Sequence, residues 1–360
     1  MLDRICNGMT IAMGLSFGGK MRFVSLLGLI GSAATLSIGN VAFATEPPSV
    51  SAGTSPGLIS AVITTSGIYT AHTTNTAINE MASGVATLSG GASRFALSLP
   101  AETGAAAAAA SRWNAWVAYS RNNVGYSFAP LQSGGTVDVG LIGVDYTLDN
   151  KTVVGVALAS DRTRVDLSFS GGNLRGSGYT ISPYIGIPLN RQWTLDASLG
   201  FGRTNVDTSQ AGVNGSFRDQ RVVGNVGVAY RQAVGNWLLT GRGSYISVDD
   251  KLGAYTLSNG TFVTSGSVNI SQLRFGGQAA FNAGNVVPYV GLSYVYDLRR
   301  PNQQSIAGQN AANDKDAWVP AIGLQFKSGG ALYGGIQYSS EQSRSQVKNN
   351  QILFNLGLRF

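Results

Sequence analysis

Cysteine and histidine are almost missing from this sequence, since its 360 residues contain one of each, Cys6 and His72. Zinc sites are built from several Cys and His side chains, and general acid–base catalysis relies most often on histidine. His72 stands in the Thr-rich stretch TAHTTNT, where we expect a solvated linker residue. The sequence therefore predicts no catalytic site, no metal site and no bound cofactor.

Charged residues are also few, at 12% of the chain, against about 25% in typical soluble proteins. The formal net charge is +7, but Arg and Lys are scattered singly, and Arg299-Arg300 is the only adjacent pair. Nucleic-acid-binding surfaces concentrate basic residues along one face, so we do not expect a nucleic-acid partner. The acidic residues Asp249-Asp250 and Asp314/Asp316 are expected in loops, as solvated charges or weak Ca²⁺ ligands.

Long apolar runs are absent beyond residue 44, so the mature chain is predicted to have no membrane-spanning helix. The N-terminus carries the pattern of an export signal, in which basic residues precede the apolar stretch FVSLLGLIGSAATLSIGNVAFA. This stretch ends in the cleavage pattern Ala42-Phe43-Ala44. We predict a signal peptide at residues 1–44, with translation starting at Met1 or Met21.

Residues 45–111 differ in composition from the rest of the chain. TEPPSVSAGTSPG has the composition of a flexible or extended linker. Further on, Ile78, Met81, Val85 and Leu88 recur at steps of three, four and three residues, which predicts a helix. The Thr-rich stretch before this helix is a weaker helix former.

From residue 112 to the C-terminus, apolar residues alternate with small or polar ones, which is the period of a β-strand. In WTLDASLGF, for example, Trp193, Leu195 and Phe201 fall on one face and Asp196 on the other. About twelve such segments follow one another, at 112–121, 135–148, 151–161, 173–189, 191–205, 216–232, 236–249, 266–282, 285–298, 314–327, 330–341 and 346–360.

The connectors between these segments alternate in length, which is typical of outer-membrane β-barrels. Tight turns are expected at 149–150, 190, 233–236, 283–284 and 328–330, and longer polar loops at 122–135, 162–172, 207–215, 250–266 and 299–314. In lipid, a sheet satisfies all of its backbone groups only as a closed barrel. A soluble β-sandwich would have to bury the small and charged side chains of the second face. We therefore predict an all-β fold, an antiparallel transmembrane barrel of about 12 strands at residues 112–360, surrounded by outer-membrane lipids.

Several stretches resemble the translocator domain of autotransporters, the type V secretion family of Gram-negative bacteria. GLIGVDYTLDNKTVVGVALAS is similar to that family's second hairpin, PYIGIPLNRQWTLDASLGFG and VPYVGLSYVYD to its later strands, and ILFNLGLRF to its C-terminal signature. The resemblance covers residues 112–360. It implies a place in the cell outer membrane and a barrel that moves or displays its N-terminal segment across that membrane.

The segment in front of the barrel departs from this family, whose members usually carry a long, repeat-rich passenger there. Residues 45–111 show no repeat, so we interpret them as a linker with a candidate pore helix at 78–88, or as a vestigial passenger. Some members cleave themselves at an Asn-Asn pair in the pore helix. Asn75 and Asn79 have no such neighbour, so self-cleavage is not expected.

Strand phase sorts the side chains of the barrel into a lumen set and a lipid set. The pore-lining candidates are basic, namely Arg231, Arg242, Arg274, Lys327 and Arg359. Such charges select ions in some pores, but single charges also suit an ordinary solvated interior. The last strand directs alternate apolar residues to lipid, namely Ile352, Phe354, Leu356, Leu358 and Phe360. The resemblance implies that the barrel-assembly machinery recognises this terminal pattern.

Three functions fit the sequence. The first is an autotransporter-type translocator that displays its N-terminal segment. The second is a passive, porin-like channel with a basic lumen. The third is a surface adhesin whose long loops bind an extracellular ligand.

Overall fold

The structure is a computed structural model that describes residues 67–74, 76, 112–300, 305–306, 309–310, 312, 314–328 and 331–360. The predicted signal peptide at 1–44 and the helix expected at 78–88 lie outside these residues. Within them, no helix is long and apolar enough to cross a membrane.

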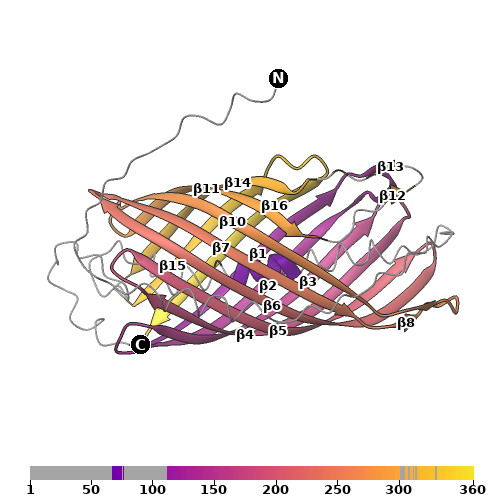
Figure 1. Cartoon of the computed structure of the whole chain (residues 1–360), viewed down its shortest axis with the longest axis horizontal. Coiled ribbons are helices and arrows are strands. Elements are labelled where there is room, and N and C mark those ends of the chain that lie inside the picture. Colours follow the sequence, from indigo (N-terminus) through magenta and orange to yellow (C-terminus); the bar gives the residue numbers. More distant parts are fainter. Residues whose placement is uncertain are drawn as a thin grey trace, which may run out of the picture. The chain divides into compact units, whose positions relative to one another are not determined.

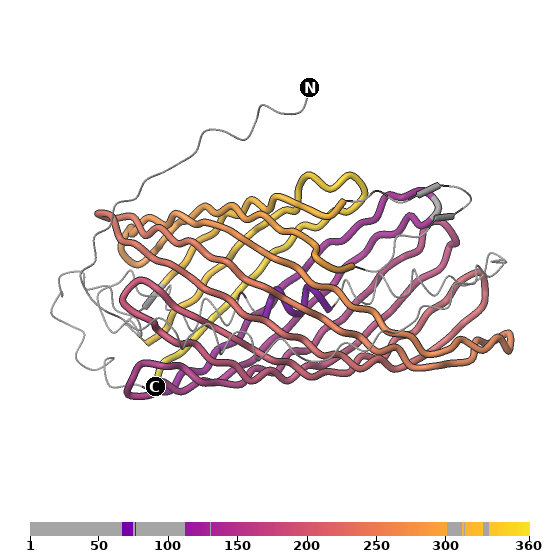
Figure 2. The backbone as a smooth tube through the Cα atoms, in the orientation of Figure 1, coloured from indigo at the N-terminus to yellow at the C-terminus, as the bar shows by residue number. Residues whose placement is uncertain are grey.

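Across the described residues, twelve antiparallel strands form one closed barrel, which confirms the predicted fold class (Figure 1). Successive barrel strands are neighbours, and the tube view in Figure 2 shows them running obliquely round the barrel. They are β1 (Trp113–Tyr126), β2 (Ser133–Thr147), β3 (Val153–Leu167), β4 (Gly172–Pro188), β5 (Trp193–Gln210), β6 (Val213–Val234), β7 (Trp237–Leu252), β10 (Gly266–Phe281), β11 (Val286–Arg299), β14 (Asp316–Ser328), β15 (Leu332–Glu341) and β16 (Val347–Arg359).

The remaining elements belong to the connections between barrel strands. A 3-10 helix, η3 (Ala129–Leu131), lies between β1 and β2. β8 (Tyr255–Thr256) pairs with β9 (Phe262–Val263), and β12 (Ser305–Ile306) pairs with β13 (Gln309–Asn310). These elements lie in every second connection or a multiple of it, so they are all at the same end of the barrel, which we call the loop end. The opposite end is the turn end. The β1–β2 connection is at the loop end, so β1 begins at the turn end.

The last strand closes the barrel against the first. The ladder between β1 and β16 runs from Asn114 opposite Arg359 to Tyr126 opposite Val347. Beyond it, the backbone N–H of Phe360 donates to the carbonyl of Trp113 at 3.1 Å. An unpaired backbone group in hydrocarbon costs several kcal/mol, so this complete ladder removes a large penalty at the seam.

Side chains alternate between the two faces of the barrel wall. On β1, Trp116, Ala118 and Ser120 are buried, whereas Val117 and Tyr119 are 42% and 46% exposed. The exposed face of the other strands carries large apolar residues, including Ile142, Phe201, Phe275, Val290, Ile322 and Phe354. Such a continuous apolar surface is a liability in water and is the face that a transmembrane barrel presents to lipid.

Two stretches that were predicted as long loops are mostly strand. Residues 162–167 and 172 belong to β3 and β4, and residues 207–210 and 213–215 belong to β5 and β6. Between β5 and β6, only Ala211 and Gly212 form the turn, with φ of 51° and 79°. These are the angles of a type I′ hairpin turn. The extension is stabilised by its own apolar cluster, made of Leu174, Val206, Phe217, Tyr255 and Leu257.

Some inward aromatic rings lie directly over glycines of the neighbouring strand. A β-carbon at Gly143 would overlap the Trp116 ring, and one at Gly357 would overlap the Tyr333 ring. The Tyr333 hydroxyl donates to Asn114 Oδ1 at 2.7 Å, which ties β15 to β1. Glycine is needed at these positions because the ring occupies the space that a side chain would fill.

Candidate functional site

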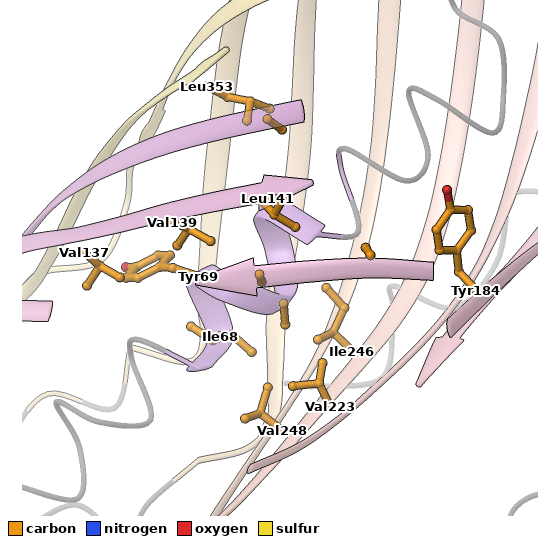
Figure 3. Close-up of a cluster of buried hydrophobic side chains, with 14 of the residues drawn as sticks. Ile68, Tyr69, Val137, Val139, Leu141, Tyr184, Val223, Ile246, Val248 and Leu353 are labelled. Carbon is orange, nitrogen blue, oxygen red and sulfur yellow. The ribbon is translucent and has the colours of Figure 1, made fainter. Parts of the chain in front are cut away.

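A helix of residues 67–74 lies inside the barrel, where it is the candidate functional element of the lumen. Ile68, Tyr69 and Ala71 are 2–7% exposed and belong to one buried apolar cluster with the barrel wall (Figure 3). The wall residues of this cluster come from β1, β2, β3, β4, β6, β7, β10, β15 and β16. Printed side-chain contacts join the helix to β1, β10 and β16, and Gly67 lies against Arg221 of β6 and Val248 of β7.

This helix occupies the Thr-rich stretch that the sequence marked as a weaker helix former. Inside a closed barrel, a peptide segment finds no free strand edge to pair with, and a helix satisfies its backbone groups internally. The threonine hydroxyls also find partners in the wall. Thr73 Oγ1 lies 2.7 Å from Ser120 Oγ of β1 and 3.5 Å from Gln351 Nε2 of β16.

His72 was expected to be a solvated linker residue, and the structure corrects this. It faces β10, with Nε2 at 2.7 Å from Gln272 Oε1 and Nδ1 at 3.5 Å from Arg274 Nη1. Burial and then the positive charge of Arg274 lower the pKa of His72 to about 3. The imidazole is therefore neutral near pH 7 and acts as a hydrogen-bonding contact between helix and wall.

A chain of polar side chains continues from His72 towards the loop end. Gln272 Nε2 donates to Asp297 Oδ1 at 2.7 Å, and Arg344 Nη1 lies 2.9 Å from Asp297 Oδ2. Arg344 Nε also lies 2.7 Å from Glu341 Oε1. Burial lowers the pKa of Arg344, but the two carboxylates outweigh it, so the pKa is raised. These contacts connect the helix to the β15–β16 connection.

Asp314 is a loop residue, as expected, but it is partly buried and hydrogen-bonded, whereas Asp316 is exposed. Asp314 Oδ2 accepts hydrogen bonds from the backbone N–H groups of Ser345 and Gln346 at 2.8 and 3.0 Å. It therefore holds the β15–β16 connection beside its own loop. Asp316 is the first residue of β14.

The predicted pore-lining arginines occupy different surroundings within the barrel. Arg242 makes a two-point ion pair with Asp196, at 2.6 and 2.8 Å. Arg359 places its guanidinium 4.9 Å from the centre of the Tyr333 ring. Arg231 is 5% exposed. Arg274 contacts His72, as described above.

Arg242, Arg359 and Arg274 thus make an acidic, an aromatic and a helix contact, respectively. Lys327 belongs to β14, but its side chain lies outside the described residues.

The structure also assembles a buried ionic cluster that the sequence did not predict. Arg221 of β6 lies within 4 Å of Asp161 of β3, Asp219 of β6 and Asp250 of β7. Asp250 was expected as a solvated loop charge, yet it lies on β7 and its residue is 0% exposed. One signal was present in the sequence, because Asp219, Arg221 and Val223 share one strand phase. In the described part of the chain, no group of His, Cys, Asp and Glu is arranged to hold a metal ion.

The C-terminal residues singled out by the sequence lie on the outer face of β16. Ile352, Phe354, Leu358 and Phe360 are 41–61% exposed, while Leu353, on the opposite face, is 0% exposed. Leu356 is partly buried beside them. This placement leaves the terminal apolar row accessible from outside the barrel.

A closed barrel with an apolar outer face and a helix of its own chain in the lumen defines a class of outer-membrane transport barrel. The autotransporter beta-domain family matches residues 117–339. No curated protein sequence matches the chain. Since the family match spans more than half of the sequence, the chain belongs to the autotransporter β-domain family.

Solved translocator domains share the fold at low sequence identity. The translocator domain of autotransporter NalP from Neisseria meningitidis superposes with a TM-score of 0.59 at 15% identity, covering 69% of this chain and 89% of that one. The β-domain of the Bordetella autotransporter BrkA superposes with a TM-score of 0.59 at 15% identity, covering 69% of this chain and 100% of that one. The transport unit of the autotransporter AIDA-I from Escherichia coli superposes with a TM-score of 0.56 at 13% identity, covering 82% of this chain and 98% of that one.

Family membership and fold agree with the first of the three functions expected from the sequence. The protein is an outer-membrane barrel of the translocator type, which transports an N-terminal passenger. Barrels of this family lie in the Gram-negative outer membrane.

Proposed function

We propose that this barrel carries its own residues 45–111 as a minimal passenger and retains helix 67–74 in the lumen as a plug. The observation that supports this is the contact of the helix with opposite parts of the wall, through Thr73 to β1 and His72 to β10. In this proposal, residues 1–44 are a cleaved signal peptide. The turn end faces the periplasm and the loop end faces outward.

A plugged translocator differs from a porin in its conductance. With helix 67–74 packed in the apolar cluster, ions find no continuous aqueous path at this level. The barrel then works as a transport unit without a catalytic step. Its partners in this proposal are outer-membrane lipid and the barrel-assembly machinery, and the loop end remains available for an extracellular ligand.

Disulfide cross-linking of the mature chain tests whether the helix occupies the lumen. Thr73→Cys combined with Ser120→Cys is expected to form a disulfide, because the two hydroxyl oxygens are 2.7 Å apart. The matched control is Thr73→Cys with Tyr119→Cys, because Tyr119 is the next residue of β1 and faces outward. Equal cross-linking of both pairs, or none with Ser120→Cys in a folded barrel, would contradict the proposed plug.

Planar-bilayer conductance separates the translocator from the porin. The chain from residue 45 to 360 is expected to conduct poorly, and deletion of 45–111 is expected to open the pore. Each sample is first checked for a folded barrel by its heat-modifiable mobility on a gel. A large steady conductance from the undeleted chain would favour a porin.

Surface labelling tests the display of the N-terminal segment. An epitope tag inserted near Ser51 is expected to be accessible to antibody in intact cells. A tag that becomes accessible only after the outer membrane is permeabilised would place this segment in the periplasm and contradict display.

A further inference from the structure

The ionic cluster around Arg221 carries more negative than positive charge. Arg221 binds Asp250 at two points, with Nε–Oδ1 at 2.8 Å and Nη2–Oδ2 at 3.2 Å. Asp161 and Asp219 approach the same guanidinium at 3.6 and 3.9 Å. If all four groups were ionised, three carboxylates would face one cation.

Asp161 and Asp219 lack the hydrogen bonds that a buried carboxylate needs. Their side chains are 0% exposed, and none of their four carboxylate oxygens accepts a hydrogen bond from the described residues. A buried ionised carboxylate without such partners is strongly disfavoured, and the usual outcome is that it takes up a proton. Because Arg221 forms its two-point pair with Asp250, the cost of burying an ionised carboxylate falls on Asp161 and Asp219.

The plug helix covers this cluster from the lumen side. Gly67, the first described residue of the helix, fits so closely that a β-carbon there would lie 3.0 Å from Arg221 Nε and 2.8 Å from Val248 Cγ1. The described part of the helix brings no charged side chain to this contact, because the residue there is glycine. His72 points instead to Gln272 and Arg274. Among the described residues, the charged groups that meet at the cluster are therefore Asp161 from β3, Asp219 and Arg221 from β6, and Asp250 from β7.

We propose that Asp161 and Asp219 form a proton-binding site in the barrel wall and couple docking of the plug helix to pH. This inference rests on the proposed plug. When the helix is docked, the site is dry and the two carboxyls hold protons. When the helix leaves, water reaches them and they ionise. Docking therefore takes up protons, so the plugged state is favoured at low pH and weakens as pH rises.

Proton linkage fixes the size of the effect. Each proton taken up on docking changes the docking equilibrium by up to about tenfold per pH unit. Two carboxyls would give up to about a hundredfold per pH unit while both titrate. His72 acts in the opposite direction in acid, because its pKa is lowered in the docked state. The pH dependence of the aspartate variants is therefore compared with wild type in chains that all retain His72.

Conductance of the full mature chain in planar bilayers, measured from pH 5 to pH 8, tests the proposal. The wild-type pore is expected to open more often as pH rises. Asp161→Asn and Asp219→Asn carry neutral amides that imitate the protonated carboxyls. Each single variant should reduce the pH dependence, and the double variant should stay closed at pH 8 as at pH 5. The matched control is Asp249→Asn, next to Asp250 on β7 and on the opposite strand phase.

The outcomes separate this proposal from the plug itself. A closed wild-type pore with no pH dependence would overturn proton coupling and leave the plug standing. A pore that is open at every pH in the wild type would overturn the plug. The proposal is also overturned if a folded double variant, or both folded single variants, keeps the wild-type pH dependence. Heat-modifiable mobility identifies the folded variants, and the single substitutions suffice if the double variant does not assemble.

Discussion

His72 and Gln272 are 200 residues apart in the chain, yet His72 Nε2 lies 2.7 Å from Gln272 Oε1 inside the barrel. Gln272 also donates to Asp297, so one amide serves both the helix and the wall. This arrangement makes Gln272 a direct link between helix 67–74 and the loop end.

Gln272→Ala is expected to loosen the helix. The substitution leaves His72 and Asp297 without this partner, and an unsatisfied buried polar group costs about 1–3 kcal/mol. Pore opening in planar bilayers should therefore increase about 5- to 150-fold. The matched control is Gln278→Ala, on the same strand and strand phase, for which little change is expected. An equal effect of both substitutions would argue against a specific link.

Replacement of His72 is expected to have a pH-dependent effect. The docked helix lowers the pKa of His72 to about 3, whereas a free histidine has a pKa of about 6.5. The contribution of His72 to docking is thus fully present above pH 6.5 and is lost as pH falls towards 3. His72→Gln removes this loss, so the variant should be more closed than wild type at pH 5, by up to about tenfold per pH unit below 6.5. At pH 7.5 His72 is neutral in both states, so protonation should no longer contribute to the difference in pore opening between His72→Gln and wild type. A difference that is the same at pH 5 and pH 7.5 would contradict the lowered pKa of His72.

Arg344→Ala is expected to destabilise the barrel. It removes the cation that lies 2.9 and 2.7 Å from two carboxylates, Asp297 and Glu341. Breaking a buried ion pair in this way typically costs about 3–5 kcal/mol. Denaturant unfolding in detergent measures the change. The control is Arg164→Ala, whose pair with Asp138 is largely exposed on the arginine side and should cost at most about 1 kcal/mol.

Gly357→Ala is expected to disturb packing between β15 and β16. The new β-carbon would overlap the Tyr333 ring, and overpacking of this kind typically costs about 1–3 kcal/mol. Movement of the ring would also weaken the hydrogen bond to Asn114. Gly140→Ala is the control, because no heavy atom lies within 4 Å of the added carbon. Equal unfolding midpoints for the two variants would show that the ring adjusts without cost.

Deletion of Phe360, or Phe360→Asp, is expected to reduce assembly in the outer membrane. Phe360 ends the exposed apolar row of β16 and is 61% exposed, so an acidic residue there would face lipid or the assembly machinery. Heat-modifiable barrel in purified outer membranes is the measurement. Phe262→Asp is the control, since Phe262 is similarly exposed but lies on the short strand β9 between β7 and β10. Normal amounts of barrel in the Phe360 variants would contradict this role.

The alternation of residues by itself determined the barrel. Trp116 and Val117, or Leu353 and Phe354, differ in face because successive side chains of a strand point in opposite directions. This alternation depends only on neighbouring residues, so the sequence predicts the face of each side chain within a strand. Closure of the last strand against the first also follows, because a barrel in lipid leaves no strand edge unpaired.

Only the tertiary structure decided what occupies the lumen and how the charges are grouped. Helix 67–74 forms where helix propensity is weak, because enclosure by the wall outweighs local preference. Asp161, Arg221 and Asp250 come together from three strands, and their distances depend on the register and shear of the whole barrel. His72 is partly buried against β10 for the same reason. Contacts across the lumen are non-local, so no pattern within one strand could specify them.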